Sequence, residues 1–311
     1  MTGSWREELA AVGEAEVRFD CRLAPYTSFG VGGPAECLVE PRSREAACEV
    51  VRRAHVHGVP LFVLGNGTNV LVRDGGIPGV TLRVAGQWSG IELDGTRLRV
   101  RAGTSLSRVC ETAAGRSLSG VEFLAGVPGT VGGATIMNAG AWEHSISECV
   151  REVCVADRQG EVHRLKPADL GFDYRRSALQ DGERVVLEVL LELSAGDEPA
   201  IRQRMMDLVE LRCQRQPVSA ASAGSTFERP PGDYAGRLIE AAGLKGYRLG
   251  GAQVSPKHAN FLANVGGATA TDLVRLIEYV RERVQEDSGV RLQAEVRIVG
   301  VDAAPEVEGT G

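Results

Sequence analysis

Apolar positions in the first part of the chain recur with two different spacings, which predicts an alternation of strands and helices. One helix is expected to begin after the capping residue Ser43 and end at Gly58, because four residues share an apolar face: Ala47, Val50, Val51 and Ala54. A second helix is expected over Ser105–Ala114. Short apolar runs predict strands at Glu36–Glu40, Pro60–Leu64, Val70–Val72, Gly90–Leu93, Leu98–Ala102, Val153–Ala156, Val162–Leu165 and Arg184–Leu193.

Turn residues connect several of these strands. Asp94-Gly95 and Gln159-Gly160 each stand between two predicted strands, which indicates two hairpins. Residues 1–20 are polar and are expected to form a short helix and an approach segment.

The pattern changes at Gly196-Asp197-Glu198-Pro199, where we place a domain boundary. The helix that follows is expected to have an apolar face at Met205, Leu208, Val209 and Leu211. A later helix carries a stripe at Leu273, Ile277, Val280 and Val284 and ends at Gly289. The alternation from Val290 to Ile298 predicts a strand, and a loose tail is expected from Asp302.

Composition narrows the function classes. The chain has 311 residues and a net charge of -6, so no basic field favours nucleic acid as a partner. Its seven cysteines are scattered and contain no C-x-x-C pair, which disfavours disulfides and zinc; no metal is expected. We find no signal-peptide pattern and no apolar run of membrane-spanning length, and we therefore expect a cytoplasmic protein.

The most informative stretch is residues 122–141, EFLAGVPGTVGGATIMNAGA, with five glycines, one proline and almost no charge. Glycine lets backbone N–H groups approach a bound anion, so the stretch is a candidate cradle for a cofactor diphosphate; a set of tight turns is the alternative. Gly30–Ala35 and Gly65–Asn69 imitate a dinucleotide fingerprint, but extended segments follow them instead of helices. No P-loop or nucleophile-elbow motif is present in the sequence.

Three polar positions are ambiguous when each is taken alone. Arg175, beside Arg176, can hold an anionic group or be a solvated surface arginine. Ser225 follows Gly224 in a small-residue loop, as many turn serines do. Glu295 can be a reactive carboxylate or the surface partner of an arginine.

Taken together, these segments resemble the UDP-N-acetylenolpyruvoylglucosamine reductase family, the flavoenzymes of peptidoglycan precursor synthesis. The resemblance runs from about Tyr26 to Gly300. It is carried by TSFGVGG (27–33), VLGNGTNVLVRDGG (63–76), LSGVEFLAGVPGTVGGATIMNAGA (118–141), YRRS (174–177), AGSTFERP (223–230), AAGLKGYRLGGAQVSPKHANFLAN (241–264) and EVRIVG (295–300).

The resemblance implies an α+β fold: a two-part FAD-binding domain of the vanillyl-alcohol-oxidase/PCMH type and a C-terminal α+β substrate domain. We place these at residues 1–196, split near residue 80, and 197–301, with 302–311 as tail. It also implies the reaction, in which NADPH reduces FAD and the flavin reduces UDP-N-acetylglucosamine enolpyruvate to UDP-N-acetylmuramate. FAD is expected to be non-covalent, because neither glycine-rich loop holds a histidine or cysteine. The partner is a small UDP-sugar, and we expect a monomer without a membrane span.

The resemblance also implies residue roles. Ser225 matches the family's proton donor, and Arg175 and Glu295 match the pair that polarises the substrate carboxylate. The cofactor is expected to contact Gly65, Asn66, Gly67, Thr68, Asn69, Gly126, Pro128, Gly129, Thr130, Gly132, Gly133, Asn138 and Gly140. The substrate is expected to contact Tyr174, Arg215, Arg229, Gln253, His258 and Asn260.

Some positions depart from the family pattern. The short run from Leu179 to Val185 is typical of the subclass without a tyrosine-bearing lid. Ala294, Glu228 and Trp142-Glu143-His144 replace more usual residues. Two other functions are alternatives. A flavin-dependent oxidase would consume oxygen without needing NADPH, and an inactive flavin-bound scaffold would have no use for all three reactive residues.

Overall fold

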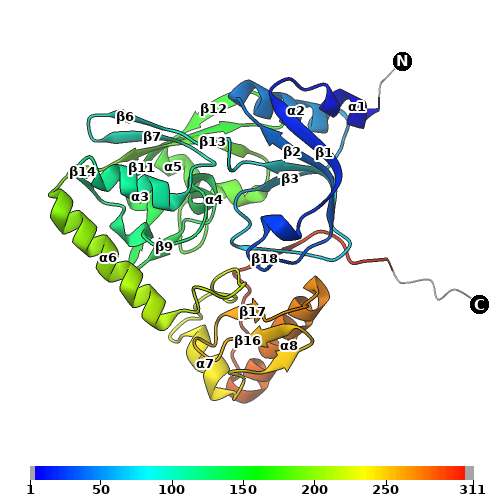
Figure 1. The fold of residues 1–311 in the computed structure, drawn as a ribbon, viewed down its shortest axis with the longest axis vertical. Helices are drawn as coiled ribbons and strands as arrows, with labels where there is room; N and C mark the ends of the chain where they lie inside the picture. The colour runs from blue at the N-terminus through cyan, green and yellow to red at the C-terminus, as the bar shows by residue number, and fades with distance from the viewer. Residues whose placement is uncertain (1–3, 305–311) are drawn as a thin grey trace, which may run out of the picture. The chain divides into compact units, whose positions relative to one another are not determined.

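The computed structural model describes residues 4–304, in which helices and strands mix without a repeating order (Figure 1). The predicted α+β class is therefore confirmed. Among the described residues, no helix combines the length and the apolar character needed to cross a bilayer. Of the predicted loose tail, residues 305–311 lie outside the described part, whereas Asp302 is held by an ion pair with Arg73 (Nη1–Oδ1 2.5 Å).

The first sheet has four strands in the order β1-β2-β5-β3. They are β1 (Ala15–Arg22), β2 (Pro34–Pro41), β3 (Leu61–Leu64) and β5 (Ile77–Arg83). Helix α2 (Arg44–Val56) begins where predicted, since Ser43 Oγ accepts a hydrogen bond from the Ala46 amide at 3.2 Å, and its apolar face is buried in one core with Cys37 and Val39. The expected approach segment is wrong, because it contains β1; that strand shows no alternation of buried and exposed positions.

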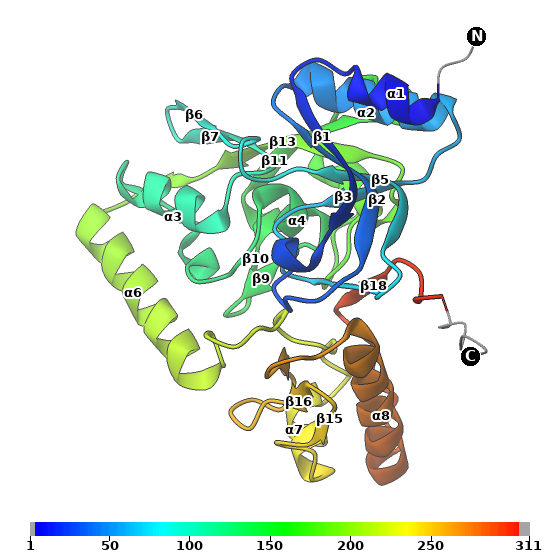
Figure 2. The ribbon, with the colours of Figure 1, turned by 45° about the vertical axis from the view of Figure 1, so that its right-hand side comes forward.

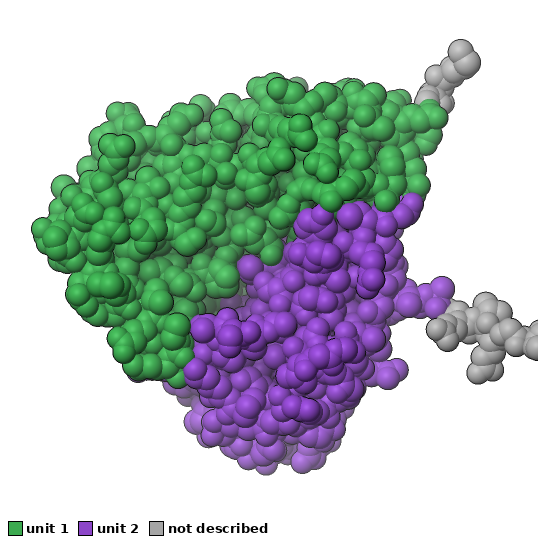
Figure 3. Space-filling model, in the orientation of Figure 1, with its two compact units in different colours: residues 1–19, 37–66, 79–214 green, residues 20–36, 67–78, 215–311 purple. Residues whose placement is uncertain are grey.

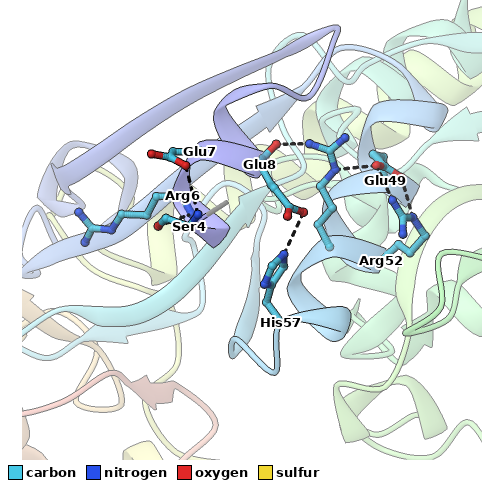
Figure 4. Close-up of polar contacts among 8 residues, drawn as sticks. Ser4, Arg6, Glu7, Glu8, Glu49, Arg52 and His57 are labelled. Atoms are coloured by element: carbon cyan, nitrogen blue, oxygen red, sulfur yellow. Dashed lines mark hydrogen bonds and ion pairs between the residues drawn. The ribbon is translucent and has the colours of Figure 1, made fainter. Parts of the chain in front are cut away.

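The N-terminal helix α1 (Trp5–Ala10) lies beside α2 (Figures 2 and 4). It begins with a capping box in which Ser4 and Glu7 bind each other's backbone amides. His57 Nε2 lies 2.9 Å from Glu8 Oε2, and this hydrogen bond lowers the pKa of Glu8 (Figure 4). The short helix is thus fixed to α2 by polar contacts at its own C-terminal half.

The second sheet is antiparallel throughout, in the order β12-β11-β13-β7-β6. Its strands are β6 (Ile91–Asp94), β7 (Arg97–Arg101), β11 (Val150–Ala156), β12 (Val162–Leu165) and β13 (Val185–Glu192). Both predicted hairpins are confirmed: Asp94 pairs with Arg97, and Ala156 pairs with Val162. Helices α3 (Leu106–Ala114) and α4 (Val131–Ile136) contribute buried residues to the same core as this sheet.

Several short elements complete this part of the chain. They are β8 (Leu118–Ser119), which pairs with β14 (Ser194–Ala195), β9 (Gly140–Ala141), which pairs with β10 (His144–Ser145), and helix α5 (Pro167–Leu170). Helix α6 (Glu198–Arg215) begins near the predicted boundary. Its buried residues are Ile201, Met205 and Leu208, whereas Val209 is 37% exposed, so the predicted apolar face is only partly correct. The buried stripe follows the i, i+4, i+7 spacing and leaves Val209 at its margin.

The last part of the chain builds a second core around helices α7 (Ala235–Ala241) and α8 (Ala270–Ser288). A three-stranded sheet of β15 (Arg248–Leu249), β16 (Ala252–Val254) and β17 (Leu262–Asn264) packs against α8 (Figure 2). The predicted stripe of α8 is buried, and the helix ends at Gly289, whose φ of +73° suits a left-handed C-cap. Strand β4 (Val70–Val72) pairs in parallel with β18 (Arg297–Val299).

The predicted strand from Val290 to Ile298 is wrong for most of its length, because only residues 297–299 form β18. Gln293, Glu295 and Val296 instead form backbone hydrogen bonds with the loop at residues 226–228. The alternation arose because Leu292 and Val296 are buried in the second core, not because the segment belongs to a regular sheet.

The described chain forms two compact units, each assembled from separate stretches (Figure 3). Unit 1 comprises residues 1–19, 37–66 and 79–214; unit 2 comprises residues 20–36, 67–78 and 215–311. Two short N-terminal stretches thus belong with the C-terminal unit. The predicted domains, 1–196 and 197–301, divide the chain by the ligand that each part is expected to bind and not by compactness. They stay a prediction.

Candidate active site

The glycine-rich segment folds into a loop followed by helix α4, which Thr130 caps by accepting a hydrogen bond from the Gly133 amide (3.2 Å). The Val131 and Gly132 amides donate to the carbonyls of Thr104 (2.9 Å) and Ala102 (2.8 Å). The first turn of the helix therefore has its donors already bound to protein acceptors. Among the described residues the amides of Gly129 and Thr130 have no acceptor, so the loop before the helix is the place where N–H groups remain for a phosphate.

The three glycines at and near this cap differ in what they allow. A Cβ on Gly65 would lie 2.9 Å from Thr130 Oγ1, so the two predicted cofactor loops lie against each other within unit 1. A Cβ on Gly132 would lie 2.8 Å from the Cβ of Ala102, so packing requires this glycine. Gly133 is exposed, and its Cβ would meet only Thr130 Oγ1 at 3.4 Å. The fold itself gives no reason for glycine at 133, which fits a bound group that approaches the helix there.

The second glycine loop continues into unit 2. A Cβ on Gly67 would lie 2.1 Å from the carbonyl oxygen of Tyr26, so close packing against the backbone explains this glycine. The Asn69 side chain donates from Nδ2 to the carbonyl oxygen of Glu295 (3.1 Å), and the Asn69 carbonyl accepts from the Arg297 amide (3.1 Å). Asn69, predicted to contact the cofactor, thus fixes the backbone from the Glu295 carbonyl to the Arg297 amide.

Arg175 sits at the tip of a tight turn closed by two hydrogen bonds between the backbones of Asp173 and Arg176 (3.1 and 3.0 Å). Its backbone has φ of +54°, a left-handed conformation that is rare for a residue other than glycine. Its Nη2 donates to the Gly140 carbonyl at 3.2 Å, and its guanidinium lies over the Tyr174 ring at 5.0 Å. Arg175 is half-buried, unlike the exposed Arg176, so the solvated-surface alternative does not describe it.

The end of α4 holds this turn in place. Buried Asn138 donates from Nδ2 to the Asp173 carbonyl (2.9 Å) and accepts from the Ser147 amide (3.2 Å). Ser177 Oγ donates to the carbonyl of Ile136 at 2.6 Å. Asn138 and Gly140, both predicted as cofactor residues, therefore join the end of the glycine-rich segment to the turn that carries Arg175.

Ser225 lies where three segments of unit 2 meet. It forms a β-bridge with Phe261, and the next residue, Thr226, accepts the amide of Glu295 on its carbonyl oxygen (2.8 Å). Phe227 forms a bridge with Ala294. Within the described residues the half-buried Ser225 hydroxyl has no hydrogen-bond partner, so it is available to a ligand. The sequence predicted Ser225 and Glu295 together, and the structure brings their backbones side by side.

Asn260 and His258 stabilise the serine loop. Asn260 is buried, accepts from the Phe227 amide (3.0 Å) on Oδ1 and donates from Nδ2 to the Phe227 carbonyl (2.8 Å). His258 Nδ1 accepts from the Asn260 amide at 3.2 Å, and burial lowers the pKa of His258, which favours the neutral ring. Asn260 therefore positions the Ser225 loop, whatever contact it also makes with substrate.

The other predicted substrate residues are spread along the chain. Gln253 donates from Nε2 to the Gly246 carbonyl at 3.0 Å. Arg229 is exposed, with its guanidinium 4.1 Å from the centre of the Tyr234 ring. Tyr174 is 48% exposed, and Arg215 ends helix α6. Of the remaining cofactor positions, Gly126 has φ of +74°, and a Cβ added there would lie 3.3 Å from side-chain atoms of Val209 and Arg212 of α6. Asn66 is exposed, Thr68 is half-buried, and Pro128 precedes Gly129.

Two features lie away from these residues. A hollow of about 510 Å³ in unit 2 is lined by residues such as Asp20, Arg22 and Asp74, and by none of the predicted site residues. Asp157, Glu161 and His163 could together reach a metal ion, but they are accounted for by the β11–β12 turn: Asp157 accepts the Glu161 amide (2.9 Å) and binds His163 Nε2 (2.6 Å).

The sequence missed two residues that support the site. Gln180 donates from Nε2 to the Arg175 carbonyl at 2.8 Å, and Thr226 joins Ser225 to Glu295 through its backbone. Neither residue type signals such a role. Only their closeness along the chain to Arg175 and Ser225 offered a hint.

Comparisons with known proteins agree with this architecture. Residues 35–166 match a family model described as an FAD binding domain, and residues 216–299 match the C-terminal domain of UDP-N-acetylenolpyruvoylglucosamine reductase. Proteins named UDP-N-acetylenolpyruvoylglucosamine reductase are similar in sequence. The one from Rubrobacter xylanophilus is 49% identical over 91% of this chain and 95% of its own length, and one from Clostridium botulinum is 43% identical over 93% and 94%.

A solved structure is also similar. The crystal structure of UDP-N-acetylenolpyruvylglucosamine reductase from Thermus caldophilus superposes with a TM-score of 0.79 at 38% identity, covering 92% of this chain and 99% of that one. Residues 178–181 form one short 3-10 helix and the chain enters β13 at Val185, so the segment from which the absence of a lid was predicted is short in the structure as well. The two domain matches confirm the predicted fold class, and the chain belongs to the UDP-N-acetylenolpyruvoylglucosamine reductase family.

Proposed function

We propose that this protein reduces UDP-N-acetylglucosamine enolpyruvate to UDP-N-acetylmuramate, with NADPH as hydride donor and FAD as relay, in peptidoglycan precursor synthesis. One observation supports this most strongly. The backbone of Thr226, the residue after Ser225, binds the amide of Glu295, and the Ser225 hydroxyl, unpartnered among the described residues, is free to act on a ligand. The reaction for which the family is named needs a proton donor, and Ser225 can supply one. A serine in an ordinary surface turn would have no such arrangement.

The residues present fit FAD. The exposed face of Gly133 and the amides of Gly129 and Thr130 would hold the diphosphate, beside Gly65 of the other loop. The remaining proposed contacts are Asn66, Gly67, Thr68, Asn69, Gly126, Pro128, Gly132, Asn138 and Gly140. When bound, FAD would supply the chemistry that no side chain can, the relay of a hydride from NADPH to the vinyl carbon of the substrate.

Arg175 is proposed to bind the carboxylate of the enolpyruvyl group. As the vinyl carbon gains hydride, negative charge grows toward that carboxylate, and a fixed guanidinium lowers the energy of this state. Two parallel N–H donors can bind both carboxylate oxygens at once. The turn at Asp173–Arg176 and the bond to Gly140 hold the guanidinium before substrate arrives, so little reorganisation is needed.

Ser225 is proposed to give its hydroxyl proton to the carbon that carries the carboxylate. A positioned general acid of this kind accelerates a reaction by roughly 10²- to 10⁴-fold. Glu295 is proposed to assist Arg175 in stabilising the charge. Because its amide is bound to Thr226, its position is coupled to that of the serine loop.

The remaining substrate assignments are also proposals. Tyr174, Arg215, Arg229, Gln253, His258 and Asn260 would contact the sugar nucleotide, with Asn260 acting at least in part through the Phe227 backbone. We further propose that the protein acts in the cytoplasm, where NADPH and UDP-sugars are available, and as a monomer, since one chain supplies every residue named here. Light scattering during gel filtration tests the latter.

An anaerobic assay tests the proposal. Purified protein with FAD is mixed with NADPH and UDP-N-acetylglucosamine enolpyruvate, and NADP and UDP-N-acetylmuramate are quantified by mass spectrometry. We expect the two products in equal amounts, and without the sugar nucleotide an NADPH loss that stops at one equivalent for each bound FAD. NADPH-independent turnover that consumes oxygen with an alcohol or sugar would indicate an oxidase, and flavin binding without either turnover would indicate a scaffold.

A further inference from the structure

The backbone of Arg175 is held in a left-handed conformation that is unfavourable for an arginine. A φ of +54° is uncommon for a long side chain, and such left-handed residues persist only where their surroundings fix them. If released, the residue would move toward the ordinary helical or extended region, and its guanidinium would leave the Gly140 carbonyl, now 3.2 Å away. The two backbone hydrogen bonds between Asp173 and Arg176 close the turn, and a contact with the backbone of Arg175 itself would help to hold this conformation.

The carbonyl of Arg175 itself accepts a hydrogen bond from a side chain. The half-buried Gln180 donates to it from Nε2 at 2.8 Å. The same Nε2 lies 3.4 Å from the sulfur of Met137, which caps the C-terminal end of α4. Gln180 thus binds the strained residue and rests on the helix that begins at the glycine-rich segment.

We infer that Gln180 is a positioning residue for the reduction: it holds Arg175 in its left-handed conformation and so aims the guanidinium at the substrate carboxylate. This rests on the proposed role of Arg175. Gln180 does not need to touch the substrate or cofactor. Its effect should be confined to the step that uses Arg175, and it should vanish when Arg175 is absent.

Gln180→Met tests the inference, because methionine keeps the length and removes the amide donor. A misplacement of about 1 Å at a reacting group costs up to roughly 10²-fold, so we expect reoxidation of NADPH-reduced protein by the enolpyruvyl sugar nucleotide to slow by about 10- to 100-fold. Reduction by NADPH should stay within about 2-fold. In the protein without substrate, amide hydrogen exchange at residues 173–176 should accelerate. Gln203→Met is the matched control, since Gln203 donates to Asp207 (2.8 Å) on exposed helix α6.

A double-mutant cycle separates this inference from the proposed function. Arg175→Met alone should slow the substrate step strongly, and adding Gln180→Met should slow it no further. If Arg175→Met leaves the substrate step unchanged, the role proposed for Arg175 fails. If Arg175→Met is slow but Gln180→Met resembles wild type, or if the two losses multiply, the inference about Gln180 is overturned. Should Gln180→Met not fold, Gln180→Asn, whose amide is one methylene too short, takes its place in the same cycle.

Discussion

The side-chain amide of Asn69 donates a hydrogen bond to the backbone carbonyl of Glu295, with 3.1 Å between Nδ2 and the oxygen. The bond joins positions 226 residues apart, and the Arg297 amide returns a second bond to the Asn69 carbonyl. The glycine loop predicted to bind cofactor thus ends in a residue whose side chain holds the backbone carbonyl of Glu295. If the loop binds the cofactor as proposed, the same short stretch of backbone also positions Glu295.

Asn69→Ala should therefore impair catalysis more than flavin binding. We expect flavin content close to wild type and a substrate step slowed by roughly 10-fold or more, because Glu295 loses one of its anchors. Flavin content is measured by absorbance after denaturation, and the substrate step by rapid mixing. Asn264→Ala is the control, because it also removes an asparagine donor to a distant backbone carbonyl, that of Phe29 (3.0 Å), at a residue proposed to contact neither cofactor nor substrate. Colourless Asn69→Ala protein would instead assign the side chain to the cofactor.

An added methyl group should destabilise the protein at Gly132 but not at the adjacent Gly133. Gly132→Ala would bring a Cβ to 2.8 Å from the Cβ of Ala102, so overpacking should lower the free energy of unfolding by about 1–3 kcal/mol. Gly133→Ala meets only Thr130 Oγ1 at 3.4 Å and should leave the apoprotein as stable as wild type or slightly more stable.

Substitution at position 133 should weaken flavin binding although it does not lower the stability of the apoprotein. If FAD approaches the exposed face of Gly133, the alanine variant should bind it at least about 10-fold more weakly, and Gly133→Val should be folded and colourless. Urea titration of the apoproteins and flavin titration by fluorescence measure the two effects. Full flavin occupancy in Gly133→Val would mean that the segment is only a turn.

The lowered pKa of His258 should make the free energy of unfolding depend on pH. Burial lowers its pKa below the ordinary 6.5, so as pH falls the unfolded chain takes up the proton first. Stability is thus fully present above about pH 6.5 and is lost as the pH falls from there toward the lower folded-state pKa. Protonation also places a hydrogen on Nδ1, which now accepts the Asn260 amide.

The comparison to make is between wild type and His258→Gln at pH 7.5 and pH 5.5. The urea midpoint of wild type should fall more between the two pH values than that of the variant, since glutamine does not titrate. An equal fall in both proteins would show that other groups carry the pH dependence.

Arg175→Lys should not be a conservative change. Lysine keeps the charge but lacks the planar pair of donors, and loss of one such donor costs about 10²-fold in rate. Steady-state turnover with NADPH and the enolpyruvyl sugar nucleotide measures the effect. Near-native turnover would return Arg175 to the class of surface arginines.

Regular elements were predictable because their signals are local. The stripe of α8 and the hairpin at Asp94-Gly95 follow from spacing and turn chemistry, and both are confirmed. The segment before Glu295 was misassigned because its partners are a loop more than sixty residues earlier, not a neighbouring strand. The sequence offered alternating apolar residues, and burial of Leu292 and Val296 produces that pattern without a sheet.

The site residues also fall into a predictable and an unpredictable group. Arg175, Ser225 and Glu295 were found through family motifs, whereas no motif assigned Gln180 or Thr226 a role. Their functions depend on backbone geometry, such as the positive φ of Arg175, that is created by tertiary contacts. Asn69 and Asn260 were identified as site residues, but the contacts of their side chains with distant backbone could not be read from the chain.

Ser225→Ala tests the central claim most directly. Flavin reduction by NADPH needs no proton at the substrate carbon, so it should stay close to the wild-type rate. Anaerobic reoxidation by UDP-N-acetylglucosamine enolpyruvate should slow by about 10²- to 10⁴-fold, equivalent to about 3–5 kcal/mol of barrier, with little change in substrate affinity. Rapid mixing of each half-reaction gives both rates. Equal slowing of the two, or a substrate step at the wild-type rate, would contradict the assignment of Ser225 as proton donor.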